Sequence, residues 1–154
     1  MPAVDPAAPH AERFAPLPDQ EATKWRGFFG RVEGEFFPRH VGIEVEEVRT
    51  DYCRMCLPYR PLLNQPAGVV HGGAIATLID TVVVPAIAMA YPTFPGLLTL
   101  HLGVSYVGAV IAVDAVAEGF VIRRGKKNVF CRAEVRTPDG ALAATGDLVY
   151  AVRP

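Results

Sequence analysis

The residues most able to do chemistry lie close together near the middle of the chain, in the run His71-Gly72-Gly73 and at Asp80. The glycines precede an apolar segment of helical length, and the first N–H groups of a helix have no partner within that helix. With no Cβ in the way, a carbonyl oxygen that becomes an oxyanion can approach these groups. One such donor typically contributes about 10² to 10³ in rate. A tight turn that simply leads into a helix is the competing interpretation.

Asp80 is the carboxylate of this apolar segment, eight residues after Gly72, which is about 12 Å along a helix axis. A ligand lying across the helix reaches both residues, more easily if two copies of the chain contribute one each. Burial favours the protonated form of a carboxylate, which suits a general base near neutrality, whereas a carboxylate beside an electrophilic carbonyl can also be a nucleophile. Pairing with a hydroxyl or backbone group at an interface is the non-catalytic alternative. The sequence leaves these roles open.

The segment 64–91 carries these residues and is apolar on every face of its helical part apart from Asp80. This pattern is typical of a helix buried in a core or a membrane. The apolar runs on either side of Asp80 are shorter than the roughly 18 residues of a membrane span. We therefore expect a helix buried in a protein core, with Pro85 kinking it or weakening its second half.

Strand patterns surround this helix in the sequence. Two precede it, with a bulge at Glu47, and four follow it; we expect them at about 41–48, 51–59, 98–106, 113–123, 128–135 and 142–150. Short turns at 124–126 and 138–140 join the last three as antiparallel hairpins. An antiparallel sheet of about six strands buries its apolar face by curling around the helix, which is an α+β fold. One sheet cannot cover so apolar a helix on all sides, so a second copy of the chain is expected to cover the rest.

The chain before the first strand divides into two parts. Residues 1–19 hold five prolines among alanines, a composition typical of a flexible or loosely packed tail. Aromatic residues from Trp25 onward then follow a helical period, which predicts an additional N-terminal helix over 20–32. Residues 20–154 are long enough for a single domain with its own core.

Composition argues against several classes of function. The formal net charge of −1 gives no general case for binding nucleic acid or a membrane surface. Cys53 and Cys56 have CxxC spacing, but residues three apart on a strand face opposite sides and no second pair follows, so no metal site is expected. The few cysteines and the lack of a signal-peptide pattern predict a cytoplasmic location.

Several residues of the central segment together resemble a known signature. They are similar to the pattern N…G..HGG….L.D of hotdog-fold acyl-CoA thioesterases, most of all the phenylacetate-degradation (PaaI-like) group. The matching residues are Asn64, Gly68, His71-Gly72-Gly73-Ala74, Leu78 and Asp80. The resemblance extends over about residues 41–152 and includes the order of strands and helix. The chain departs from the pattern in having one extra residue between Asn64 and Gly68.

The resemblance implies a role for each matching residue. Asp80 matches the acidic residue that acts as general base or nucleophile, and Gly72 matches the residue whose N–H polarises the thioester carbonyl. Asn64 matches a side chain that positions the attacking water or the carbonyl, and His71 matches its partner in shaping the loop. Thr99 matches a hydroxyl that reaches the site from the strand after the helix. In the family, Asn64 and Gly72 of one chain face Asp80 and Thr99 of the other, which implies a homodimer, paired further into a homotetramer.

The implied substrate is an acyl-CoA, hydrolysed to free acid and CoA, with no cofactor beyond the CoA that the substrate carries. Gly73 and the basic turn Arg123-Arg124-Gly125-Lys126-Lys127 are implied to contact it, the turn through the CoA phosphates. Taken alone, the turn fits a solvated hairpin tip equally well. Two other functions on the same fold stay open: a non-catalytic protein that binds acyl-CoA or an acyl carrier, and a dehydratase that recruits His71.

Overall fold

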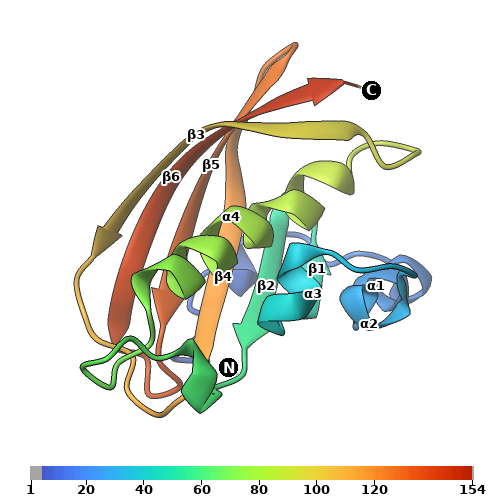
Figure 1. Cartoon of the computed structure of the whole chain (residues 1–154). Helices are drawn as coiled ribbons and strands as arrows, with labels where there is room; N and C mark the ends of the chain where they lie inside the picture. Colours follow the sequence, from blue (N-terminus) through green and yellow to red (C-terminus); the bar gives the residue numbers. More distant parts are fainter. Residues whose placement is uncertain (1–4, 154) are drawn as a thin grey trace.

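The computed structural model describes residues 5–153, and for residues 30 and 31 only the backbone. Within this range, six strands form one antiparallel sheet in the order β1-β2-β4-β5-β6-β3, and the sheet curls around a long helix (Figure 1). The strands are β1 (Glu44–Arg49), β2 (Tyr52–Leu57), β3 (Gly96–Tyr106), β4 (Ala115–Arg124), β5 (Asn128–Arg136) and β6 (Leu142–Arg153). This confirms the predicted α+β hotdog arrangement.

The long helix α4 (Gly72–Ala88) lies across the inner face of the sheet, chiefly over β2 and β4. Its sheet-facing side chains are fully buried, and glycines in the strands allow the close approach. A Cβ on Gly119 would lie 2.6 Å from a methyl group of Val82, and one on Gly146 would overlap Ile79. Pro85 does not end the helix, which continues to Ala88.

The pairing of neighbouring strands confirms most of the predicted hairpins. β4 pairs with β5 and β5 with β6, both antiparallel, and the register of β1 against β2 shifts between Val45 and Glu47, as expected for the bulge. Cys53 belongs to the core beneath α4, whereas Cys56 lies three residues further along β2 on the other face. The outer face of the sheet is therefore also partly buried.

The N-terminal helix is not the single element predicted over 20–32. It is divided into α1 (Asp19–Trp25) and α2 (Phe28–Arg31), because Gly27 between them adopts a left-handed conformation with φ of 66°. A further short helix, α3 (Phe37–Val41), follows before β1. Glycine adopts this backbone conformation without the steric cost that other residues incur, so a helical period of aromatic residues can continue across a break.

Residues 5–18 differ from the loosely packed tail expected over 1–19. They run over the outer face of the sheet, on the side opposite α4, and include the short 3₁₀ helix η1 (Ala11–Arg13) (Figure 1). Ala7, Ala8 and Ala11 are buried, and the ring of Phe14 stacks on Tyr52 with centroids 5.2 Å apart. Small alanine side chains let the backbone lie close to the strands. Alanines among prolines form no hydrophobic period, so the sequence pattern does not predict this contact. Residues 1–4 lie outside the described chain.

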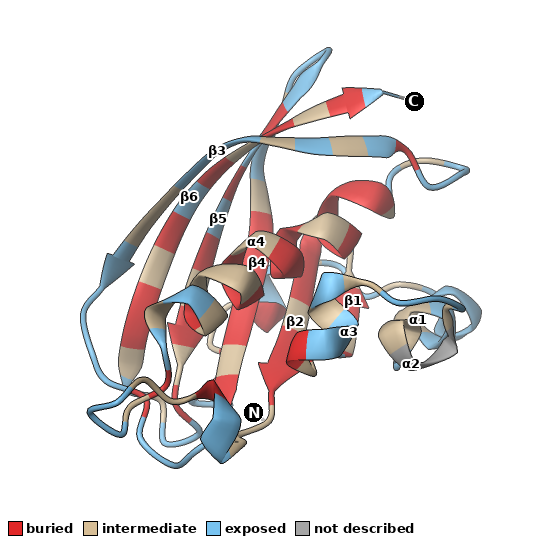
Figure 2. Ribbon diagram, in the orientation of Figure 1, coloured by how far each residue is buried: buried red, intermediate tan, exposed pale blue. Residues whose placement is uncertain are grey.

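Strand β3 forms one edge of the sheet and contrasts with the strands beneath α4. Figure 2 shows β2 mostly buried and β3 mostly exposed or intermediate. Leu98 and Leu100 are 61% and 55% exposed. Apolar side chains that stay uncovered along an edge strand are unusual at a protein surface. Between residues 5 and 153, no helix has both the length and the apolar character needed to cross a membrane.

Candidate active site

Asp80 lies half-buried near the middle of α4, on the side that faces β3 and β6. The hydroxyl of Thr99 donates a hydrogen bond to Asp80 Oδ1 at 3.1 Å, and the hydroxyl of Tyr150 donates to the same oxygen at 2.6 Å. The Tyr150 hydroxyl also lies 2.7 Å from the backbone oxygen of Asp80. Both side-chain bonds use Oδ1, so within the described chain Oδ2 has no hydrogen-bond partner. That oxygen is free to accept a proton or to attack a carbonyl carbon.

Tyr150 is a site residue that the sequence analysis missed. β3 and β6 pair so that Thr99 lies directly opposite Tyr150, which brings both hydroxyls to the same point on α4. Burial, reinforced by the hydrogen bond to Asp80, raises the pKa of Tyr150, so its hydroxyl stays protonated and donates. Two donors from two strands therefore fix the orientation of the Asp80 carboxylate.

The start of α4 carries a second group of predicted residues. His71 is the N-cap, and its Nδ1 accepts a hydrogen bond from the Gly73 N–H at 2.8 Å. The N–H groups of Ala74 and Ile75 both bond to the His71 carbonyl. Among the residues that the structure describes, nothing accepts from the Gly72 N–H. Gly72, and not Gly73, therefore presents the free backbone donor, because His71 occupies the other one.

Tyr106 explains why residue 72 is a glycine. Its hydroxyl donates to the Gly72 carbonyl at 2.8 Å, and its ring lies against the Gly72 backbone. A Cβ at position 72 would be 3.3 Å from two ring carbons, closer than most such contacts. A Cβ on Gly73 would be 3.0 Å from His71 Nδ1 and would disturb the cap. Gly72 thus leaves room for the ring of Tyr106, and Gly73 leaves room for the His71 cap.

Asn64 lies beside this helix start. The loop between them is closed by an antiparallel bridge between Asn64 and Val70 and by a hydrogen bond from the His71 N–H to the Leu63 carbonyl at 2.8 Å. The Asn64 side-chain nitrogen donates to the Tyr59 hydroxyl at 3.0 Å. Its Oδ1 is buried and has no hydrogen-bond partner in the described part of the chain. The extra residue before Gly68 does not move Asn64 away from His71.

The predicted catalytic residues therefore form two groups within one chain. Asn64, His71 and Gly72 gather at the start of α4, and Asp80 and Thr99 gather around its middle. Eight residues separate Gly72 from Asp80 on the helix, which corresponds to about 12 Å along the axis. A single carbonyl group cannot contact both in one copy of the chain.

The basic turn between β4 and β5 is less uniform than its sequence. Arg123, Gly125, Lys126 and Lys127 line a shallow depression in the surface. Arg124 instead turns inward: its guanidinium bonds to Asp51 at 2.5 Å and to the carbonyls of Ala86 and Ile87 at 2.8 and 3.1 Å. These carbonyls end α4, where a cation also complements the helix dipole. The predicted substrate contact therefore does not fit Arg124, whose donors are used inside the protein.

An antiparallel sheet wrapped around a long helix is the hotdog fold. The free N–H at the start of the helix and the accessible carboxylate further along it are groups that a hydrolase can use. The thioesterase superfamily pattern matches residues 67–144, a span that includes His71, Gly72, Asp80 and Thr99. The chain belongs to the thioesterase superfamily, and its activity class is that of a thioester hydrolase.

Individual relatives agree with this assignment. A Halobacterium salinarum protein named "Putative esterase VNG_1336C" is 33% identical over 103 residues, which cover 64% of this chain and 68% of that protein. An X-ray structure of a thioesterase-superfamily protein is 28% identical, with a TM-score of 0.75 over 88% of this chain and all of that chain. The PaaI protein of the E. coli phenylacetic acid degradation operon is 14% identical and shares the fold, with a TM-score of 0.70 over 76% of this chain and 83% of that chain.

Proposed function

We propose that the protein is an acyl-CoA thioesterase that acts as a homodimer, with each active site shared between two copies of the chain. The observation that carries the proposal is the free N–H of Gly72 together with the unpaired Oδ2 of Asp80, both on α4. The first is a donor suited to an oxyanion, and the second is a base or nucleophile. A thioester hydrolase of this kind uses no cofactor beyond the CoA of its substrate.

The need for two copies follows from distance. A reacting carbonyl must lie about 3 Å from its oxyanion donor and within reach of the base, yet the two groups are about 12 Å apart on one helix. Two α4 helices related by a two-fold axis bring Gly72 of one copy to Asp80 of the other. The bare edge of β3 supports this pairing, since a second β3 would cover Leu98 and Leu100. Pairing of dimers into a tetramer would cover the exposed Ile122 and Phe130.

The proposed reaction begins with the thioester carbonyl oxygen accepting a hydrogen bond from the Gly72 N–H. In the general-base route, water attacks the carbonyl carbon while Asp80 Oδ2 takes a proton from it. The tetrahedral intermediate then collapses, the C–S bond breaks, and the proton goes to the departing CoA thiolate. In the nucleophilic route, Oδ2 attacks the carbon, CoA leaves, and water hydrolyses the acyl–Asp80 anhydride. Thr99 and Tyr150 hold Oδ1 in both routes.

Substitution of Asp80 by Asn tests the proposal. We expect Asp80→Asn to reduce the kcat for acyl-CoA hydrolysis by about 10³ or more, because a carboxamide neither accepts a proton nor attacks. Free thiol release across acyl-CoAs measures the rate. Asp147→Asn is the matched control, since Asp147 is an exposed carboxylate whose single ion-pair partner among the described residues is Arg132. Near-normal turnover by Asp80→Asn would overturn the proposal, and binding without hydrolysis by the wild type would favour a non-catalytic acyl-CoA protein.

The two routes differ in whether an acyl group is ever bonded to Asp80. In a single turnover in H₂¹⁸O, unlabelled acid with ¹⁸O in Asp80 identifies the nucleophilic route, with water opening the anhydride at the Asp80 carbon. Labelled acid with unlabelled Asp80 arises from the general-base route or from attack on the acyl carbon of the anhydride. A rapid-quench mass spectrum of the whole protein separates these two cases, because the added acyl mass occurs only in the nucleophilic route.

The nucleotide end of CoA is proposed to contact Arg123, Lys126 and Lys127, which remain at the surface once Arg124 is assigned to α4. Cations on an exposed turn suit phosphate groups. The double substitution Lys126→Ala and Lys127→Ala is expected to raise the KM for acyl-CoA several-fold with little change in kcat. The KM for the matching acyl-pantetheine, which lacks the nucleotide, should stay constant.

A further inference from the structure

One cavity in the described chain is not part of either catalytic group. It has a volume of about 480 Å³ and lies between α1–α2 and the segment that follows α4. This size falls within the range of small-molecule sites. Four aromatic residues and a methionine contribute to its walls: Trp25, Phe28, Met89, Tyr91 and Phe94.

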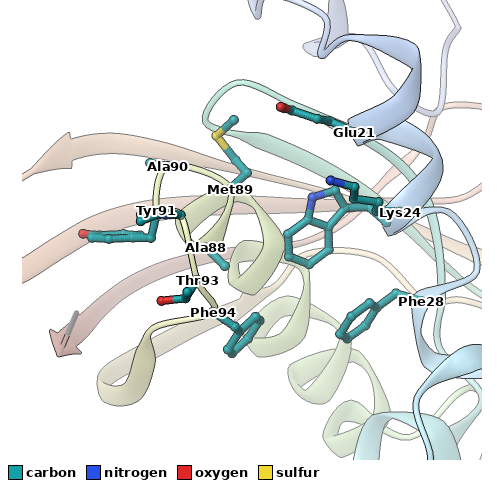
Figure 3. Close-up of a pocket in the computed structure, with 11 residues that line it drawn as sticks. Glu21, Lys24, Phe28, Ala88, Met89, Ala90, Tyr91, Thr93 and Phe94 are labelled. Atoms are coloured by element: carbon teal, nitrogen blue, oxygen red, sulfur yellow. The ribbon is translucent and has the colours of Figure 1, made fainter.

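The aromatic side chains line a concave surface and are only partly buried. Figure 3 shows Phe28 projecting from one wall, with Phe94 on the other, and Trp25 of α1 also lines the cavity. Trp25 and Phe28 are half-buried, and Phe94 remains 57% exposed. Lys24 and Glu21 are exposed residues of α1 that also line the cavity. The aromatic rings, in a wall that also carries polar groups, give the apolar end of a ligand a surface to pack against.

One side of α4 connects this cavity to the proposed reaction centre. Asp80, Val84 and Ala88 follow each other at intervals of four residues, so they lie along that side of the helix. Asp80 and Val84 are half-buried, and Ala88, which is buried, lies at the cavity wall. The rise from Asp80 to Ala88 is about 12 Å, close to the length of an acyl chain of about ten carbons. The nucleotide of CoA lies beyond the whole pantetheine arm, too far from the thioester to match this separation.

We infer that this cavity binds the distal end of a medium-chain acyl group, whose thioester lies at Asp80 and whose chain follows Val84 along α4. The inference rests on the proposed thioesterase function and adds the class of acyl group. Aromatic rings and a methionine favour a flexible hydrocarbon tail, and no charged side chain lies between Asp80 and Ala88 on that face. The enzyme therefore prefers acyl chains long enough to reach Trp25.

Chain-length profiles test the inference. Phe94→Ala should lower kcat/KM for decanoyl-CoA roughly tenfold, because lost apolar contact weakens binding of the tail, and should change kcat/KM for acetyl-CoA less than about twofold. Trp25→Ala is a second variant with the same expectation. Phe37→Ala is the matched control, since Phe37 is 62% exposed on α3 and outside the cavity. Equal losses for both substrates, or no loss for decanoyl-CoA, would overturn the inference.

Trp25 also gives a direct binding signal, because it is the single tryptophan of the chain. In the Asp80→Asn variant, decanoyl-CoA should shift or quench its fluorescence, whereas acetyl-CoA and free CoA should not. An equal response to free CoA would mean that the nucleotide occupies the cavity, which contradicts the inference. If the wild type hydrolyses no acyl-CoA at all, the proposed function fails; if hydrolysis occurs but no variant alters the chain-length profile, only the acyl site fails.

Discussion

Asp80 on α4, over the inner face of the sheet, and Glu118 on β4, at its outer face, both accept a hydrogen bond from a tyrosine but have different surroundings. Asp80 on the inner side accepts a hydrogen bond from Tyr150 at 2.6 Å, and Glu118 on the outer side accepts one from Tyr52 at 2.9 Å. Asp80 is half-buried, and its Oδ2 has no hydrogen-bond partner within the described chain. Glu118 is only 1% exposed. A tyrosine–carboxylate pair alone therefore does not identify an active site.

The N-terminal segment makes the difference. The backbone N–H of His10 donates to Glu118 Oε1 at 2.9 Å, and residues around it cover the carboxylate. The second carboxylate oxygen of Glu118, Oε2, is buried and has no hydrogen-bond partner among the described residues. Burial raises the pKa of Glu118, with hydrogen bonds from Tyr52 and His10 acting in the opposite direction. A perturbed pKa often marks a functional site, but the N-terminal segment encloses Glu118, so its raised pKa does not identify one here.

The largest expected effect separates the two carboxylates by activity. Glu118→Gln should keep kcat within about threefold of the wild type, whereas Asp80→Asn should lose about 10³, because Glu118 is enclosed and Asp80 is the proposed base or nucleophile. Steady-state thiol release on the two purified variants measures this contrast. Circular dichroism confirms that both are folded. A large loss of activity in a folded Glu118→Gln would break the comparison.

Tyr150 and Tyr52, which donate to Asp80 and Glu118, allow a second comparison of the two carboxylates. Tyr150→Phe should lower kcat about tenfold, because the Asp80 carboxylate loses one of the two donors that hold its orientation. Tyr52→Phe should leave kcat unchanged and reduce the free energy of unfolding by about 1–2 kcal/mol, since buried Glu118 loses a donor. Steady-state kinetics and urea unfolding of both variants are the measurements. An unchanged kcat in Tyr150→Phe would exclude a positioning role for Tyr150.

The sequence predicted the parts of the site that are local and missed those that depend on long-range pairing. His71, Gly72 and Asp80 lie on one helix, so their spacing alone relates them. Tyr150 comes next to Asp80 only through the register of β6 against β3. The inward turn of Arg124 depends on the end of a helix 37 residues earlier in the chain.

The errors at the N-terminus have a similar origin. Residues 5–18 contact the sheet through alanines and backbone groups, which leave no hydrophobic period, and His10 meets Glu118 across 108 residues. Gly27 broke a helix whose aromatic period continued beyond it. Composition predicted a flexible or loosely packed tail, because it does not show that the outer face of the sheet offers complementary contacts to residues 5–18.

The pH dependence of stability follows from the raised pKa of Glu118. The folded protein holds this proton more tightly than the unfolded chain, whose carboxyl titrates near 4.5. The stabilising contribution is thus complete below that pH and is lost as the pH rises through the raised value. Glu118→Gln cannot ionise, so its stability relative to the wild type should increase from pH 4.5 to pH 8. Thermal unfolding across this range measures the difference, with Asp147→Asn as a control that should show no such trend.

The smallest effect concerns the side chain of His10, which lies 3.0 Å from Glu134 through its Nε2. Although burial opposes it, bonding to His10 and Arg136 lowers the pKa of Glu134, so this carboxylate contributes to stability above its unfolded value, opposite in sign to Glu118. His10→Ala should cost about 1 kcal/mol in urea unfolding near pH 6 and leave kcat unchanged. Because the backbone N–H of His10, not its ring, bonds to Glu118, the rise in relative stability of Glu118→Gln with pH should persist in the His10→Ala background. Loss of that trend would mean that the imidazole, and not the covering segment, keeps Glu118 closed.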